Sequence, residues 1–99
     1  MQTHSITLGM NIPNAGTVTN QMWIDFLNVT VLASLEYATI TDSVGIYQGT
    51  LEKSKTISVT TEDPAAVDAL RKVGDAYKNA FNQNAIMYTV TAVPILQFT

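Results

Sequence analysis

Apolar and polar residues alternate along several stretches of the chain, and a period of two predicts strands with one buried face. The first stretch covers residues 3–10, in which the even-numbered residues of Ile6–Met10 are apolar. A second covers residues 37–48, which are rich in β-branched and aromatic types. We expect a bulge or bend in this second strand at Asp42–Ser43 and Gly45.

Two more strands are predicted further along the chain. Gln48–Gly49–Thr50 is typical of a hairpin tip, and an alternating stretch follows it at residues 56–60. The last alternating stretch covers residues 86–92. It ends or bends at Pro94, because proline has no backbone N–H to donate.

Apolar residues spaced three and four apart predict two helices between these strands. The first follows a turn at residues 11–16, begins after an N-cap at Thr17 or Thr19, and runs to about Ala33. The second begins at Asp63–Pro64, because the carboxylate accepts free backbone N–H groups and proline fixes φ in the first turn. Its buried stripe consists of Val67, Leu70, Gly74, Tyr77 and Phe81. The glycine in that stripe would let the helix approach the sheet closely.

The resulting order of elements predicts a ferredoxin-like βαββαβ sandwich of the α+β class, with a four-stranded antiparallel sheet and two helices on one face. No linker or repeat divides the chain, so we interpret residues 1–99 as a single domain with an apolar C-terminal extension at 93–99. The uncovered sheet face should carry Ser5, Thr7, Thr56, Ser58, Thr60, Thr89 and Thr91. These hydroxyls fit either an open surface favoured by β propensity or a surface that contacts a second sheet or a ligand.

Charge is scarce: only 13% of the 99 residues are charged, and the formal net charge is −3. A net negative chain disfavours general affinity for nucleic acid or anionic membrane. No aromatic residue occupies residues 51–61, where RNA-recognition modules would stack bases. The lack of cysteine excludes disulfides and thiolate chemistry. Because the sequence shows no signal peptide or membrane span, we expect a cytoplasmic protein, in the host cytoplasm if viral.

Residues capable of catalysis are sparse. His4 is the only histidine, and it stands at the start of a strand, where a structural or surface role is more common than general-base catalysis. Glu62 and Asp63 are interpreted as acids at a helix start rather than metal ligands. The sequence contains no GxSxG, P-loop, GxGxxG or HExxH motif. We therefore predict no catalytic set, no metal site and no cofactor.

Glu52, Lys53 and Lys55 form the densest group of charges in the chain. They fit either an exposed strand end or a contact with an anion or a partner. Residues 93–98 are too apolar to lie comfortably in water. Together with the charge-poor surface, this segment leads us to expect a homo-oligomer.

Short motifs follow one another in a definite order between about residues 6 and 90. They are Leu8–Gly9, Gly16–Thr17–Val18–Thr19, Trp23, Phe26–Leu27, Gly45, Glu52–Lys53–Ser54–Lys55, Tyr77, Phe81, Gln83 and Ala85–Ile86. Their order and spacing resemble a bacterial and viral family catalogued as domain of unknown function number 3574. Met10 stands where that family usually has an arginine, and Ser34–Tyr37 replaces a longer turn.

The resemblance implies no activity, but it points to site residues. The candidates for ligand or partner binding are the polar residues Glu52, Lys53, Ser54, Lys55, Tyr77 and Gln83. Tyr77 also lies on the core stripe, with a hydroxyl that could emerge at the helix edge beside Gln83. For a chain without a leader, the resemblance implies a phage-encoded member that works inside a host cell.

Two functional hypotheses follow from these patterns. The first is a small non-enzymatic binding protein, such as a viral accessory or counter-defence protein that holds a nucleotide signal, another small molecule or a host protein. The alternative is a small enzyme with a site at the sheet edge, using Glu52 as a base or Tyr77 as an acid.

Overall fold

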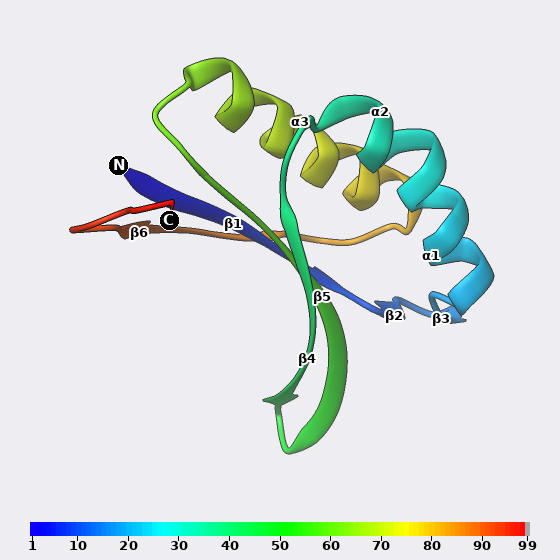
Figure 1. Cartoon of the computed structure of the whole chain (residues 1–99). Helices are drawn as coiled ribbons and strands as arrows, with labels where there is room; N and C mark the ends of the chain where they lie inside the picture. The colour runs from blue at the N-terminus through cyan, green and yellow to red at the C-terminus, as the bar shows by residue number, and fades with distance from the viewer. Residues whose placement is uncertain (99) are drawn as a thin grey trace.

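A four-stranded antiparallel sheet carries all the helices on one of its faces (Figure 1). Its strands lie in the order β4 (Thr39–Tyr47), β5 (Thr50–Thr61), β1 (Gln2–Gly9) and β6 (Met87–Ala92). This is the predicted ferredoxin-like βαββαβ arrangement. The computed structural model describes residues 1–98. Within that range, no helix combines the length and apolarity that crossing a membrane requires.

A short hairpin joins β1 to the first helix, where the sequence predicted only a turn. It consists of β2 (Asn11–Ile12) and β3 (Gly16–Thr17), which pair antiparallel. Two residues here have positive φ: Asn14 in the turn, at 62°, and Gly16 at the start of β3, at 86°. Asparagine and glycine are the residues that adopt this backbone region most readily.

Thr19 is the N-cap of the first helix, which confirms one of the two predicted caps. Its hydroxyl accepts a hydrogen bond from the Met22 N–H at 3.1 Å. Helix α1 (Asn20–Phe26) continues through a π-helical turn (Leu27–Val31) into α2 (Leu32–Ser34). The predicted end near residue 33 is therefore confirmed, and the π-helical turn is an addition that the apolar spacing did not reveal.

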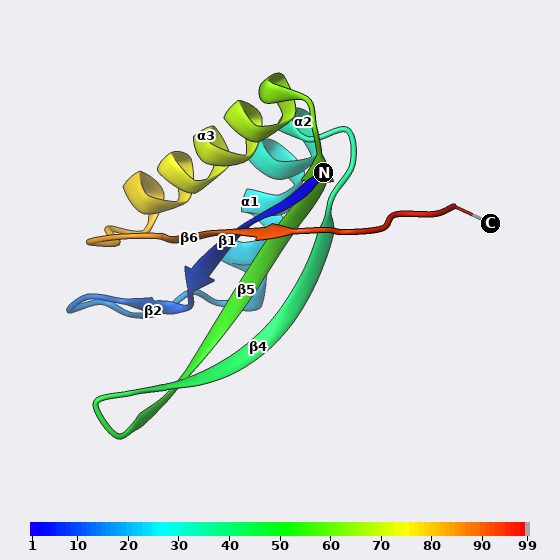
Figure 2. The same ribbon diagram turned by 90° about the vertical axis from the view of Figure 1, so that its left-hand side faces the viewer.

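Strands β4 and β5 form a long hairpin arm that extends away from the helices (Figures 1 and 2). They pair residue for residue, so the bulge or bend expected at Asp42–Ser43 and Gly45 was wrong. The register places Asp42 directly opposite Lys55, and the ion pair between them stabilises the strand pairing at the residue where a bulge was expected. The predicted tip is confirmed at Gln48 and Gly49, whose φ values of 50° and 76° suit a two-residue turn.

Helix α3 (Pro64–Ala80) begins at Asp63 as predicted, and the Asp63 carboxylate accepts from the Ala65 N–H at 2.9 Å. Its buried face packs on β1 and β5. A Cβ added at Gly74 would lie 3.7 Å from the Ile6 side chain, which is an ordinary contact. The helix therefore lies close to the sheet without needing a glycine there.

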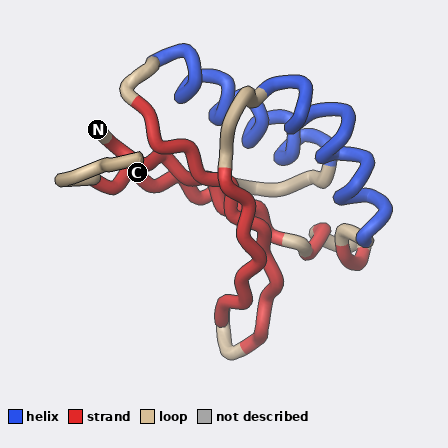
Figure 3. The backbone as a smooth tube through the Cα atoms, in the orientation of Figure 1, coloured by secondary structure: helices blue, strands red, loops and turns tan. Residues whose placement is uncertain are grey.

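The core lies between the sheet and the helices. It consists of Ile6, Leu8, Val18, Trp23, Phe26, Val31, Ile57, Val59, Leu70, Val73, Tyr77 and Phe81. The opposite sheet face carries hydroxyls, and Figure 3 shows the helices on the other side of the sheet. Cross-strand hydroxyls pair at Thr3–Thr60 (2.7 Å) and Ser5–Ser58 (2.8 Å), which satisfies part of their hydrogen-bonding capacity.

Candidate functional site

A groove lies between the hairpin arm and the segment that links β1 to α1. Its volume is about 790 Å³, which falls in the range of about 300–1,000 Å³ typical of small-molecule sites. It is lined by Met10, Asn11, Thr17, Val18, Thr19, Asn20, Asp42, Ser43, Val44, Leu51, Lys53, Ser54 and Lys55. The groove therefore combines amide, hydroxyl and charged groups with apolar surface.

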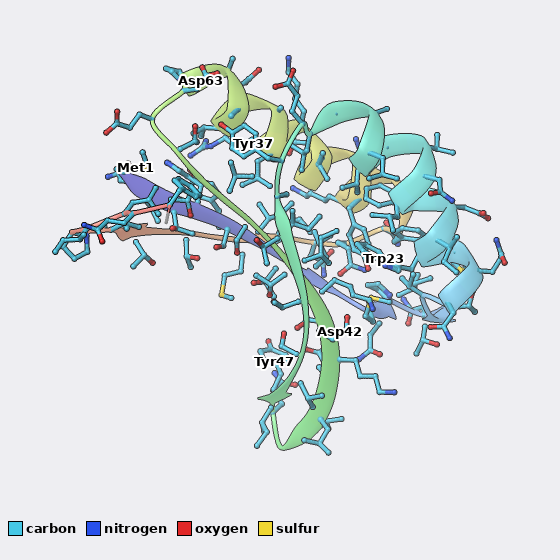
Figure 4. All side chains as sticks on the ribbon, viewed as in Figure 1. Met1, Trp23, Tyr37, Asp42, Tyr47 and Asp63 are labelled. Atoms are coloured by element: carbon cyan, nitrogen blue, oxygen red, sulfur yellow. The ribbon has the colours of Figure 1, made fainter. Side chains whose placement is uncertain are left out.

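Lys53 and Lys55 project from the same face of β5, because residues two apart in a strand share a side. The Lys55 ammonium lies 2.5 Å from an Asp42 carboxylate oxygen and 5.5 Å from the centre of the Trp23 ring. Figure 4 labels Trp23 and Asp42 on the groove side of the arm. Lys53 is exposed and has no carboxylate partner within residues 1–98. It is therefore the cation in this groove whose charge remains unpaired.

Three other candidates hold the segment Gly9–Asn11, which forms one side of the groove. The Tyr77 hydroxyl donates to the Gly9 carbonyl at 2.5 Å. The Gln83 side-chain amide donates to the Asn11 carbonyl at 2.8 Å, and the Asn11 side-chain amide donates to the Glu52 carboxylate at 3.1 Å. These bonds fix the bend through which β1 runs into β2.

Tyr77 lies in the core with its hydroxyl directed to Gly9, so the structure does not bring that hydroxyl to the helix edge. Burial disfavours the charged phenolate and raises the pKa of Tyr77 to about 12. A proton held this firmly is poorly suited to transfer at neutral pH.

Glu52 and Ser54 project from the face of β5 opposite to that of Lys53, on the side of the sheet away from the helices, although Ser54 also borders the groove. Glu52 pairs with Gly45 across the ladder, and a Cβ added at Gly45 would meet nothing within 4 Å. Glu52 itself is half-buried, and its carboxylate is held by the Asn11 side-chain amide. The Ser54 hydroxyl lies 2.7 Å from that of Ser43.

The remaining sequence candidates have structural partners. His4 is buried, and its Nδ1 lies within hydrogen-bond distance of the Tyr88 hydroxyl. Glu62 lies 3.5 Å from the N-terminal ammonium. Among residues 1–98, no group of three or more His, Asp or Glu side chains could hold a metal ion.

A family model for proteins of unknown function, DUF3574, matches residues 3–96. The chain belongs to this family. The match confirms the resemblance found in the short motifs, and no curated protein matches the sequence.

Two solved structures of a phage SAM lyase are similar to this DUF3574 chain. The structure in complex with S-methyl-5′-thioadenosine has a TM-score of 0.64 and 17% identity over 91% of this chain and 79% of that chain. The apo structure has a TM-score of 0.64 and 19% identity over 91% and 78% of the two chains. At these identities, the likeness shows a shared fold.

The sequence did not identify Asn11, Asp42 and Trp23 as neighbours of the candidate residues in this DUF3574 chain. Asp42 lies 13 residues from Lys55 in the chain, and only the strand register brings the two together. The charged residues at 52–55 were the sequence feature that pointed to the hairpin arm as a candidate site.

Proposed function

We propose that this protein binds a small nucleoside-type molecule with an anionic group in the groove beside Lys53. The observation that carries the proposal is the presence of an unpaired ammonium in a groove of about 790 Å³ that also has hydroxyl and amide donors. Lys53 would bind the anionic group, and Thr17 and Asn20 would hydrogen-bond the polar edge of a base or ribose. Val44 and Leu51 would cover its apolar surface.

The phage SAM lyase supports the nucleoside class, because a structure with this fold is complexed with S-methyl-5′-thioadenosine. The anionic group could be the carboxylate of S-adenosylmethionine or the phosphate of a nucleotide signal. In an infected cell, a protein that holds such a molecule would serve as a viral accessory or counter-defence protein.

Isothermal titration calorimetry with three ligands tests this proposal. S-adenosylmethionine carries a carboxylate, a cyclic dinucleotide carries phosphates, and S-methyl-5′-thioadenosine carries neither. If S-adenosylmethionine or the cyclic dinucleotide binds, we expect its affinity for Lys53→Ala to be about tenfold or more lower than for wild type. The reason is that hydrogen bonds to charged groups contribute roughly 1.5–3 kcal/mol. The control is Lys72→Ala, which removes an ammonium paired with Asp68 on α3. If none of the three binds, or if Lys53→Ala binds as wild type does, the groove is not this site.

Catalysis on a sulfonium substrate is a second candidate, and the half-buried Glu52 carboxylate favours it, because it is held next to Asn11, a residue that lines the groove. A carboxylate stabilises a nearby positive charge and can also remove a proton as a general base. The fold shared with a phage SAM lyase makes S-adenosylmethionine the substrate to test. Tyr77 has no part in this candidate because its hydroxyl is bound to Gly9.

Chromatography of S-adenosylmethionine after incubation with the protein tests for release of S-methyl-5′-thioadenosine. We expect Glu52→Gln to abolish release and Glu36→Gln, at an exposed residue, to retain it. Without release by the wild-type chain, the protein is a binder rather than a lyase.

A further inference from the structure

Strand β4 forms an edge of the sheet and pairs only with β5. All nine of its residues are exposed. Edge strands are usually protected by lysine, proline, a bulge or a covering segment, yet β4 has neither lysine nor proline and pairs without a bulge. Its one charged residue, Asp42, is neutralised by Lys55. The outer backbone groups of β4 are therefore available to another strand.

The C-terminal segment 95–98 follows β6 and Pro94, at the opposite edge of the sheet. It carries no charge, and its Ile95 and Phe98 are 76% and 92% exposed. Figure 2 shows this segment running away from the body of the molecule. Two further strands, β5 and β1, separate β6 from β4 in the same chain.

The side chains of this segment match those of the β4 edge. Val44 and Ile46 lie two residues apart on the helix-facing side of β4, and Ile46 is 77% exposed. In an extended segment Leu96 and Phe98 also share one side. Strand addition would therefore place two apolar pairs side by side, each contributing about 0.2–1 kcal/mol. The segment itself carries no charge and Asp42 is paired with Lys55, whereas the unpaired Lys53 lies opposite Val44 in the ladder.

We propose that residues 95–98 of one copy add as a short strand to the β4 edge of a second copy. Backbone hydrogen bonds would supply the pairing, and the apolar pairs would select the register. Because the tail and the β4 edge are different surfaces, the contact is heterologous unless two copies exchange tails. Val44 also lines the groove, so the added strand would lie next to the proposed ligand site, although strand addition does not require a bound ligand.

Light scattering after size-exclusion chromatography tests the proposal on full-length chains. We expect wild-type mass to be a multiple of 10.8 kDa, and we expect Phe98→Asp and Ile46→Lys to shift it toward the monomer. The control is Val29→Lys, at a residue 75% exposed on the π-helical turn. A wild-type monomer at all concentrations, or an unchanged mass in Phe98→Asp, would overturn the proposal.

Disulfide trapping provides a second, positional test, because the chain has no cysteine of its own. Phe98→Cys protein is mixed with Ile46→Cys protein and oxidised, so that a mixed disulfide can form only between two chains. We expect several times more heterodimer than with Phe98→Cys and Val29→Cys. Equal yields in the two mixtures would show that the tail does not lie on the β4 edge.

Discussion

Replacing Tyr77 with phenylalanine separates the role of its hydroxyl from that of its ring. The ring packs between Phe26 and Phe81, with centroid distances of 5.3 and 4.7 Å. Phenylalanine keeps this packing and loses the 2.5 Å bond to the Gly9 carbonyl. We expect the free energy of unfolding to fall by about 1 kcal/mol near neutral pH. In a domain of this size, that corresponds to a melting temperature lower by about 4–8 °C.

The pH dependence of stability gives a sharper test of the same hydroxyl. Burial raises the pKa of Tyr77 from 10.0 to about 12, so the unfolded chain loses this proton at lower pH than the folded chain. Between these two values the unfolded state binds fewer protons, and stability must fall as pH rises. At pH 11 the loss from this group is about 1.4 kcal/mol relative to pH 8. Tyr77→Phe lacks that loss, so its deficit at pH 8 should vanish or reverse at pH 11.

Urea unfolding followed by circular dichroism at pH 8 and pH 11 measures this difference. Other groups that titrate in this range are common to both proteins and cancel in the comparison. Tyr47→Phe is the matched control, because Tyr47 is an exposed tyrosine near the hairpin tip. If wild type and Tyr77→Phe lose the same stability between the two pH values, the Tyr77 hydroxyl is not buried as described.

Helix α3 offers two further predictions, both measurable by urea unfolding. Gly74→Ala should raise stability by about 0.5–1 kcal/mol, because alanine favours helix and its Cβ would meet Ile6 and Ile86 at 3.7 Å; a loss above about 1 kcal/mol would contradict this. Asp63→Ala removes the cap on the Ala65 N–H and should cost about 0.5–2 kcal/mol, whereas Asp63→Asn should retain most of it. Equal stability of the two Asp63 variants would show that the hydrogen bond to the Ala65 N–H does not account for the stabilisation by Asp63.

Signals confined to a few neighbouring residues were sufficient to predict most of the elements. The caps at Thr19 and Asp63 and the turn at Gln48–Gly49 depend on their own side chains and backbone, so the sequence identified them. The expected bulge or bend in β4 failed for the opposite reason. Asp42 and Gly45 are residue types that often interrupt a strand. Whether the strand continues depends, however, on the residues of β5 that pair with them, and these are distant in sequence.

The same distinction explains why the candidate site was only partly predictable. Glu52 and Lys53 are adjacent in sequence and were grouped as one patch of charge, yet strand geometry turns them to opposite faces of the arm. Lys53 faces the groove, whereas Glu52 lies on the hydroxyl face. Both faces of the arm are accessible because the arm extends beyond the helices (Figure 1), and the sequence does not reveal that extension.

Glu52, Tyr77 and Gln83 come from distant parts of the chain and converge on Gly9–Asn11. Their occurrence among the family motifs therefore does not require them to contact a ligand. Each holds the bend that shapes one side of the groove, and a displaced bend would alter the groove beside Lys53. The polar motif residues thus fall into two groups: some hold the bend beside the groove, and others line the groove itself.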